Sequence, residues 1–114
     1  MAIAAEAVVL RAAEGAPAVT FEPAAVVGGT PEQVEMARWA VGRFEVAGLA
    51  LPPVEIRFHD DMDGCGGHLG FYRGGGVDIC GISTNLIARR NLLHEMAHAC
   101  AEENVRSRSE PVST

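Results

Sequence analysis

Hydrophobic residues recur every three or four positions over residues 31–47, which is the spacing of one face of an α-helix. The segment Thr30-Pro31-Glu32-Gln33 begins this run with a capping hydroxyl, proline at the first helical position and glutamine for a reciprocal cap. Gly48 follows the run, and glycine commonly ends a helix in the left-handed conformation. The pattern predicts a helix that ends near Ala47 and places Trp39 and Phe44 in the core.

From residue 54 to residue 59 apolar and polar residues alternate strictly, which predicts a strand with one buried face. Residues 60–76 contain three Asp and seven Gly, the composition of a long loop or an irregular hairpin. Residues 77–82 read as a second short strand. Its glycine neighbours favour a position at the edge of a sheet, where it would border a cleft.

A last helix is predicted from about Asn85 to Asn104, capped by Ser83 or Thr84. Its core stripe is expected to include Met96 and Cys100, together with Leu93 and Ala97. Residues 1–29 are expected to form an N-terminal arm or strand, and residues 105–114 a frayed tail. The pattern as a whole predicts one α+β domain over residues 1–114, in which a small, mostly antiparallel sheet packs on two main helices.

Composition and charge narrow the classes of function. The chain has 114 residues, 48% of them hydrophobic, and a formal net charge of -6, so it should have a core but no basic surface for nucleic acid. No apolar run is long enough for a membrane span, and Glu6 within the apolar start argues against a signal peptide. Three cysteines, an odd number, favour a cytoplasmic protein. A disulfide between Cys65 and Cys80 remains an alternative to their packing as apolar groups, or to metal ligation by Cys65.

The segment His94-Glu95-Met96-Ala97-His98 carries the chemistry of the last helix. Two imidazoles four residues apart lie on one face, about 6 Å apart along the axis, so both can reach one ion. Zinc fits two nitrogen ligands and tolerates an open position for water. Glu95 would lie beside the ion and take a proton from that water. The sequence therefore predicts Zn²⁺ held by His94 and His98, with Glu95 as the catalytic base.

The strand-then-helix order, Val77-Asp78-Ile79-Cys80 followed by Leu92-Leu93-His94-Glu95-Met96-Ala97-His98, resembles the zincin metallopeptidases over roughly residues 54–104. The resemblance implies that the two histidines bind zinc and that the glutamate is the general base. It also implies that an edge strand receives an extended peptide by β-augmentation, which makes Val77, Asp78 and Ile79 the expected substrate-binding residues. A peptide or protein would then be the substrate.

The chain departs from the zincin pattern in lacking a clear third zinc ligand. Asn104 stands where the metzincins have a third histidine, and too few residues follow His98 for the later glutamate-bearing helix of the gluzincins. Glu102 lies about 12 Å along the axis from His94, too far for one straight helix to supply all three ligands. By ligand chemistry and expected proximity, His68 and Glu110 are the foremost candidates, followed by Cys65, Asp61, Asp63 and His59.

Three functions fit these expectations. The first is a small zinc metallopeptidase with Glu95 as general base. The second is an inactive module with the same fold and an incomplete metal site, which binds a protein segment without cutting it. The third is a structural ion that stabilises the fold, which would require a closed site with four ligands.

Overall fold

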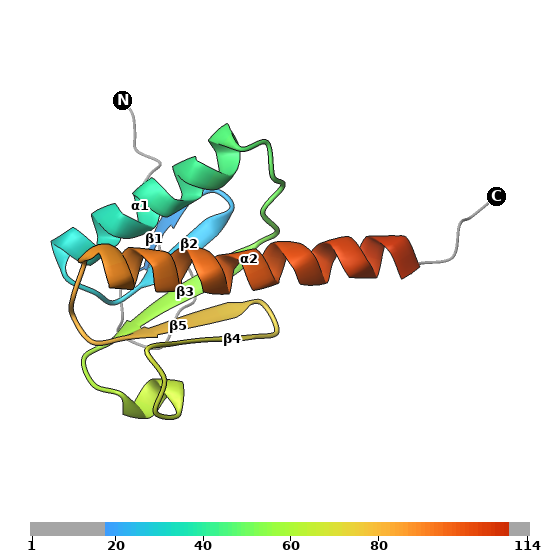
Figure 1. Cartoon of the computed structure of the whole chain (residues 1–114). Helices are drawn as coiled ribbons and strands as arrows, with labels where there is room; N and C mark the ends of the chain where they lie inside the picture. Colours follow the sequence, from blue (N-terminus) through green and yellow to red (C-terminus); the bar gives the residue numbers. More distant parts are fainter. Residues whose placement is uncertain (1–17, 110–114) are drawn as a thin grey trace.

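The computed structural model describes residues 18–109, which form two α-helices and one five-stranded sheet (Figure 1). The predicted α+β class is confirmed. Residues 1–17 of the predicted N-terminal arm and residues 110–114 of the predicted tail lie outside the described part of the chain. No helix within residues 18–109 has both the length and the apolar character needed to cross a bilayer.

The sheet is mixed, so the prediction of a mostly antiparallel sheet is wrong. Its strands are β1 (Ala18–Phe21), β2 (Ala24–Val27), β3 (Val54–His59), β4 (Gly70–Arg73) and β5 (Gly76–Cys80), in the order β1-β2-β3-β5-β4. The outer pairs β1-β2 and β4-β5 are antiparallel hairpins, whereas β3 pairs in parallel with β2 and with β5. The hairpins are local, and turn residues in the sequence indicate them. The parallel pairs join segments that are distant in sequence, and the strand pattern alone does not specify such pairs.

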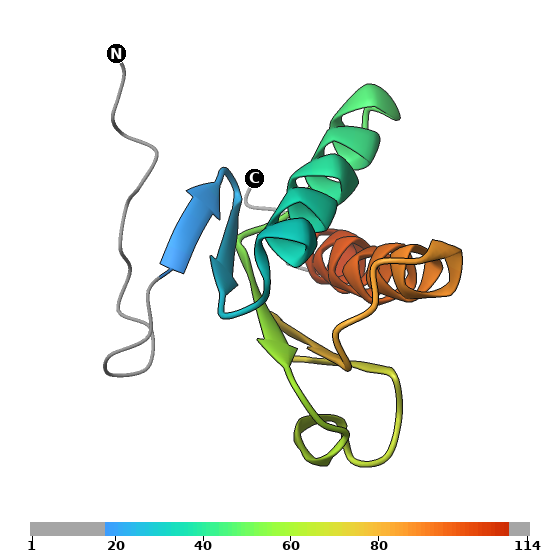
Figure 2. The same ribbon diagram turned by 90° about the vertical axis from the view of Figure 1, so that its left-hand side faces the viewer.

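Both helices, α1 (Pro31–Val46) and α2 (Leu86–Ser109), lie on the same face of the sheet (Figure 2). The core fills the space between the two layers. Ile56 and Val77 from the sheet and Met36, Leu92 and Met96 from the helices are completely buried there.

Helix α1 follows its prediction closely. Thr30 and Gln33 form the reciprocal cap, and Gly48 has the positive φ angle of 73° that ends the helix. The buried amide of Gln33 also donates to the carbonyl of Gly81, which ties the start of α1 to the connection that leads into α2. Phe44 is in the core as predicted, but Trp39 is 36% exposed and lies under the guanidinium of Arg89 instead.

The predicted edge strand is an inner strand. β5 pairs with β3 on one side and with β4 on the other, so β4 forms the edge. Gly74 and Gly75 both have positive φ angles, which suits the tight turn that folds β4 back along β5. The glycines that suggested an edge therefore make the turn beside β5, and the hairpin places β4 outside it.

The predicted substrate-binding residues on β5 already make contacts within the folded protein. Val77 and Ile79 belong to the hydrophobic core, and the backbone of β5 is paired on both sides. Asp78 points to the opposite face of the sheet, because side chains alternate along a strand. Neither the backbone nor these side chains are available to an added peptide strand, so β-augmentation at β5 is excluded.

Asp78 is instead the acceptor of a charged cluster on that opposite face. Arg57 donates to both of its carboxylate oxygens, at 2.9 and 3.1 Å, and Nε2 of His59 lies 2.7 Å from Oδ1. Burial raises the pKa of Asp78, but the hydrogen bonds from Arg57 and His59 outweigh it, so the pKa lies below its ordinary value. The cluster joins β3 to β5 on the face of the sheet that points away from α2.

We expect Asp78→Asn to lower the free energy of unfolding by about 1.5–3 kcal/mol at pH 7, the usual contribution of hydrogen bonds to a charged group. Because the folded-state pKa of Asp78 is depressed, this stabilisation is complete above its unfolded pKa, near 3.9, and is lost as the pH falls through the folded value. Urea unfolding at pH 7 and in acid would measure both variants, with exposed Asp60→Asn as the control. An Asp78→Asn effect of the same size at both pH values would contradict this account.

Candidate metal centre and groove

The rotation of α2 about its axis differs from the one that the sequence predicts. The completely buried side chains are Leu92, Met96 and Ala99, whereas Ala97 of the predicted stripe is exposed and Cys100 is only half-buried. The helix also begins later and ends later than predicted, at Leu86 and Ser109, and its cap is the side chain of Asn85, which accepts from the amide of Ala88. Ser83 accepts from the amide of Asn85 and so supports the cap instead of forming it.

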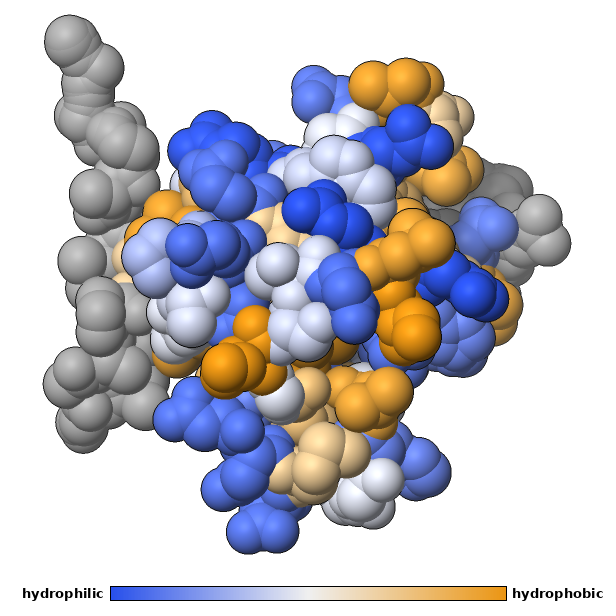
Figure 3. All heavy atoms as spheres, turned by 60° about the vertical axis from the view of Figure 1, so that its left-hand side comes forward, coloured by the Kyte–Doolittle hydropathy of each residue, from blue (hydrophilic) through white to orange (hydrophobic). Residues whose placement is uncertain are grey.

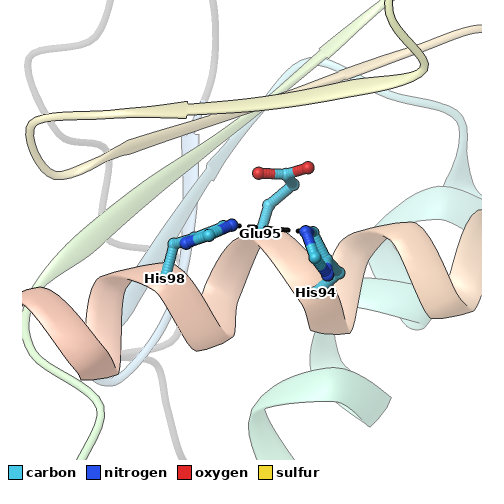
Figure 4. A group of neighbouring side chains, drawn as sticks. All are labelled: His94, Glu95 and His98. Atoms are coloured by element: carbon cyan, nitrogen blue, oxygen red, sulfur yellow. Dashed lines mark hydrogen bonds between the residues drawn. The ribbon is translucent and has the colours of Figure 1, made fainter.

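The two histidines of the motif lie one turn apart on the same side of α2. Nε2 of His94 and Nε2 of His98 lie 3.2 Å apart, with their rings nearly perpendicular at 86° (Figure 4). Two nitrogens bound to one tetrahedral zinc ion at 2.0–2.1 Å would be about 3.3 Å apart. Both imidazoles are exposed, so the pair has the separation and the access that a shared zinc ion requires.

Glu95 is the third member of this group. One ligand atom from each of His94, Glu95 and His98 lies within 4.8 Å of the others. The carboxylate of Glu95 reaches away from α2 toward the β4–β5 hairpin (Figure 4). Among the side chains that the structure describes, it has no hydrogen-bond donor or ion-pair partner, although the side chain is half-buried. It is therefore available to accept a proton from a molecule bound between the helix and β4.

Gly70 on β4 makes the space for this carboxylate. A Cβ atom built at Gly70 would lie 3.1 Å from Cγ of Glu95, 3.4 Å from its Oε2 and 3.3 Å from Cδ1 of Ile79. The backbone of Gly70 does not have a positive φ, so glycine is needed here for close approach and not for its conformational freedom. β4 and α2 therefore pack tightly against each other at Gly70 and Glu95.

Tyr72 and Glu102 complete the surroundings of His98, and the sequence interpretation assigned neither of them to the site. The ring of Tyr72 is stacked on that of His98, with centroids 6.2 Å apart and planes 16° from parallel. The hydroxyl of Tyr72 donates to Glu102, four residues after His98, and accepts from the amide of Gly75. The signal that could have found Tyr72 is its position two residues after Gly70, which puts both on one face of β4.

Among the described residues, none of the predicted candidates for a third ligand joins the group of His94, Glu95 and His98. His68 lines the same hollow as His94 and Glu95, but it does not belong to the group of mutually close ligand atoms. Glu110 lies outside the described residues. His59 is bound to Asp78 on the far face of the sheet, and Asp61 and Asp63 are exposed in the loop before β4.

Cys65 is excluded as a ligand because it forms a disulfide with Cys80. Cys65 ends a short 3₁₀ turn, Asp63–Cys65, and Cys80 ends β5, so the bond attaches the loop to the last residue of an inner strand. Both half-cystines are buried. The disulfide anchors the start of the segment that leads through His68 and Leu69 into β4.

His94, Glu95 and His98 are together called the metal group below. A groove runs along β4 and α2 on both sides of it. Its first hollow, of about 860 Å³, includes His68, Arg90, His94 and Glu95, and a small hollow of about 300 Å³ continues from Glu95 to Tyr72 and His98. A third, of about 550 Å³, extends past His98 to the later turns of α2. Neighbouring hollows share lining residues, so the three lie in a row along β4 and α2. We call this the β4–α2 groove; it is lined by residues of 68–72 and 87–105.

We expect Gly70→Ala to displace the side chain of Glu95 by a few tenths of an ångström, because the added methyl group would meet Cγ at 3.1 Å. Gly42→Ala is the matched control: nothing lies within 4 Å of its Cβ, and alanine in a helix interior should stabilise the protein by about 1 kcal/mol. Crystal structures of both variants would measure the displacement. An unchanged Glu95 in Gly70→Ala would contradict the tight contact between β4 and α2.

Comparisons with known proteins do not extend the zincin resemblance. No protein-family model, no curated protein and no solved structure matches the chain. The geometry of His94, Glu95 and His98 and of the groove around them is therefore the ground on which a function is argued.

Proposed function

We propose that the protein is a zinc-dependent metallopeptidase in which His94 and His98 hold the ion and Glu95 is the general base. The observation that carries this proposal is the 3.2 Å separation of the two Nε2 atoms beside a carboxylate without a partner among the described residues. The two ring nitrogens also lie within hydrogen-bond distance of each other. The adjacent carboxylate and the open groove are what favour a shared ion over a hydrogen-bonded pair on a solvated helix face.

The chemistry divides between the ion and Glu95. A bound zinc ion supplies Lewis acidity, which lowers the pKa of water and polarises a peptide carbonyl. Glu95 accepts one proton from the attacking water as the carbon–oxygen bond forms. It then gives that proton to the nitrogen of the leaving amine as the carbon–nitrogen bond breaks, so Glu95 ends the reaction deprotonated. No covalent intermediate with the protein is needed.

The groove supports a peptide as the substrate. The hollows continue on both sides of Glu95, which suits an extended chain that passes through the site. One wall of the groove is β4, an edge strand whose outer side can pair with an added strand. The substrate strand that the zincin resemblance implies at residues 77–79 is therefore proposed for β4, one strand further out.

A second candidate, a binding module without catalysis, rests on the missing third protein ligand. Within residues 18–109 the only group close enough to hold an ion is His94, Glu95 and His98. If Glu95 were a ligand, it would not be free to act as the base. In that case the same groove and edge strand would hold a protein segment without cutting it.

The cytoplasmic location predicted from the odd number of cysteines remains a proposal. Disulfides persist mainly in oxidising compartments, so the Cys65–Cys80 bond weighs against this location. The acidic net charge of -6 still supports the proposal that nucleic acid is not a partner.

We expect the full-length protein, purified without added zinc, to contain about one zinc ion per chain, because His94 and His98 converge on one point. His94→Ala and His98→Ala should each lower zinc affinity at least tenfold, and elemental analysis with a competing chelator would measure this. His68→Ala tests the third ligand: a comparable loss would assign His68 to the ion. Unchanged zinc affinity in both motif variants would contradict the proposed centre.

Glu95→Gln should retain zinc and lose hydrolysis by a factor of about 10² or more, because the amide keeps the shape of the side chain but cannot accept the proton. Cleavage of a quenched fluorescent peptide library, with zinc content measured in parallel, would show both effects. Glu45→Gln, at an exposed position on α1, makes the same chemical change away from the groove and should keep full activity. Peptide turnover by Glu95→Gln at the wild-type rate would rule out Glu95 as the base.

A further inference from the structure

The first hollow of the β4–α2 groove combines apolar walls with one permanent cation. Leu69 and Ile87 line it and are 50% and 57% exposed, and Leu86 beside them is 71% exposed. Figure 3 looks onto this end of the molecule, where hydrophobic patches lie among hydrophilic ones. Exposed apolar side chains gathered in a hollow indicate a surface that buries a ligand. Arg90 is the only arginine that lines any part of the groove within the described residues.

Arg90 is placed to act together with the metal group. It precedes His94 by four residues, so the two lie on one side of α2, about 6 Å apart along the axis. Within residues 18–109 the guanidinium of Arg90 has no carboxylate partner, whereas Arg57 and Arg38 pair with Asp78 and Glu35. An arginine without a partner in a hollow can bind a carboxylate of the ligand through two parallel hydrogen bonds.

The charges of Arg90 and Glu95 decide where a carboxylate can lie in this hollow. Glu95 faces the same hollow and would repel an anion placed beside it, which restricts a carboxylate to the Arg90 end. Leu69 and Ile87, which line the same hollow and are exposed, suit an aliphatic side chain of the ligand.

We propose that this hollow recognises a peptide segment with an aliphatic side chain next to an acidic one, and that Arg90 is the residue that selects the acidic side chain. The inference rests on the proposed function for the position of the cleaved bond, but not for the binding itself. An acidic side chain fits a chain that passes through the groove, because further hollows lie beyond Glu95.

Binding of matched peptides to the full-length Glu95→Gln protein tests this proposal without cleavage. The first pair, acetyl-Ala-Ala-Leu-Asp-Ala-Ala-amide and its Leu-Asn counterpart, differs only in the charged side chain. The second pair, acetyl-Ala-Ala-Leu-Ala with a free or an amidated C-terminus, differs only in the terminal carboxylate. Calorimetry with and without zinc should show that the Leu-Asp peptide binds about fivefold more tightly than its Leu-Asn partner, the preference expected of an exposed ion pair. A preference confined to the second pair would overturn the acidic side chain and identify the C-terminus as the source of the carboxylate.

Arg90→Gln should abolish this preference, whereas Arg43→Gln, at an exposed position on α1, should keep it. Equal affinities within both pairs, no measurable binding of any peptide, or a preference that persists in Arg90→Gln would each overturn the proposal. The two proposals fail separately. A preference that depends on Arg90 in a protein that neither binds zinc nor cleaves peptides would reject the peptidase and leave Arg90 as the selecting residue of a binding groove.

Discussion

The rotation of α2 about its axis is the constraint on which the candidate site depends. Leu92 and Met96 are completely buried, and burial of such side chains contributes about 1.5–3 kcal/mol each, far more than the exposed histidines gain from any one contact. With these two side chains held against the sheet, Glu95 must face β4, and both imidazoles lie beside it. The packing of the core therefore sets the orientation of the motif helix. The polar side chains of the site do not determine it.

The strand order separates two kinds of polar chemistry. β5 is an inner strand, so its alternate side chains face opposite sides of the sheet: Val77 and Ile79 support α2, and Asp78 binds Arg57 on the far side. The charges of the far side are paired and stabilise the β3–β5 pair. In the groove, Glu95 and Arg90 are without partners among the described side chains, so their charges are available to a ligand. The unpaired charges are on the face where a ligand can reach them.

Local signals in the sequence predicted their elements well. The cap at Thr30 and the glycine at position 48 bound α1 as expected, and the strict alternation of residues 54–59 gave β3. Predictions that depended on partners distant in sequence were wrong. Trp39 fits a helix stripe, but Arg89 from α2 covers it at the surface, and the glycines beside β5 are as compatible with a hairpin turn as with an edge. The buried side of α2 is similarly ambiguous from sequence, because apolar residues occur on more than one side of this helix.

The sequence by itself determined the α+β class and the placement of two imidazoles on one face of a helix, because four residues make about one turn of any α-helix. It also supplied both cysteines of the disulfide, without deciding between a bond and its alternatives. Only the tertiary structure decided that β4 is the edge strand, that Gly70 makes room for Glu95 and that Tyr72 stacks on His98. The physical reason is that periodicity fixes which residues share a face of one element, whereas the neighbour of that face depends on the packing of the whole core.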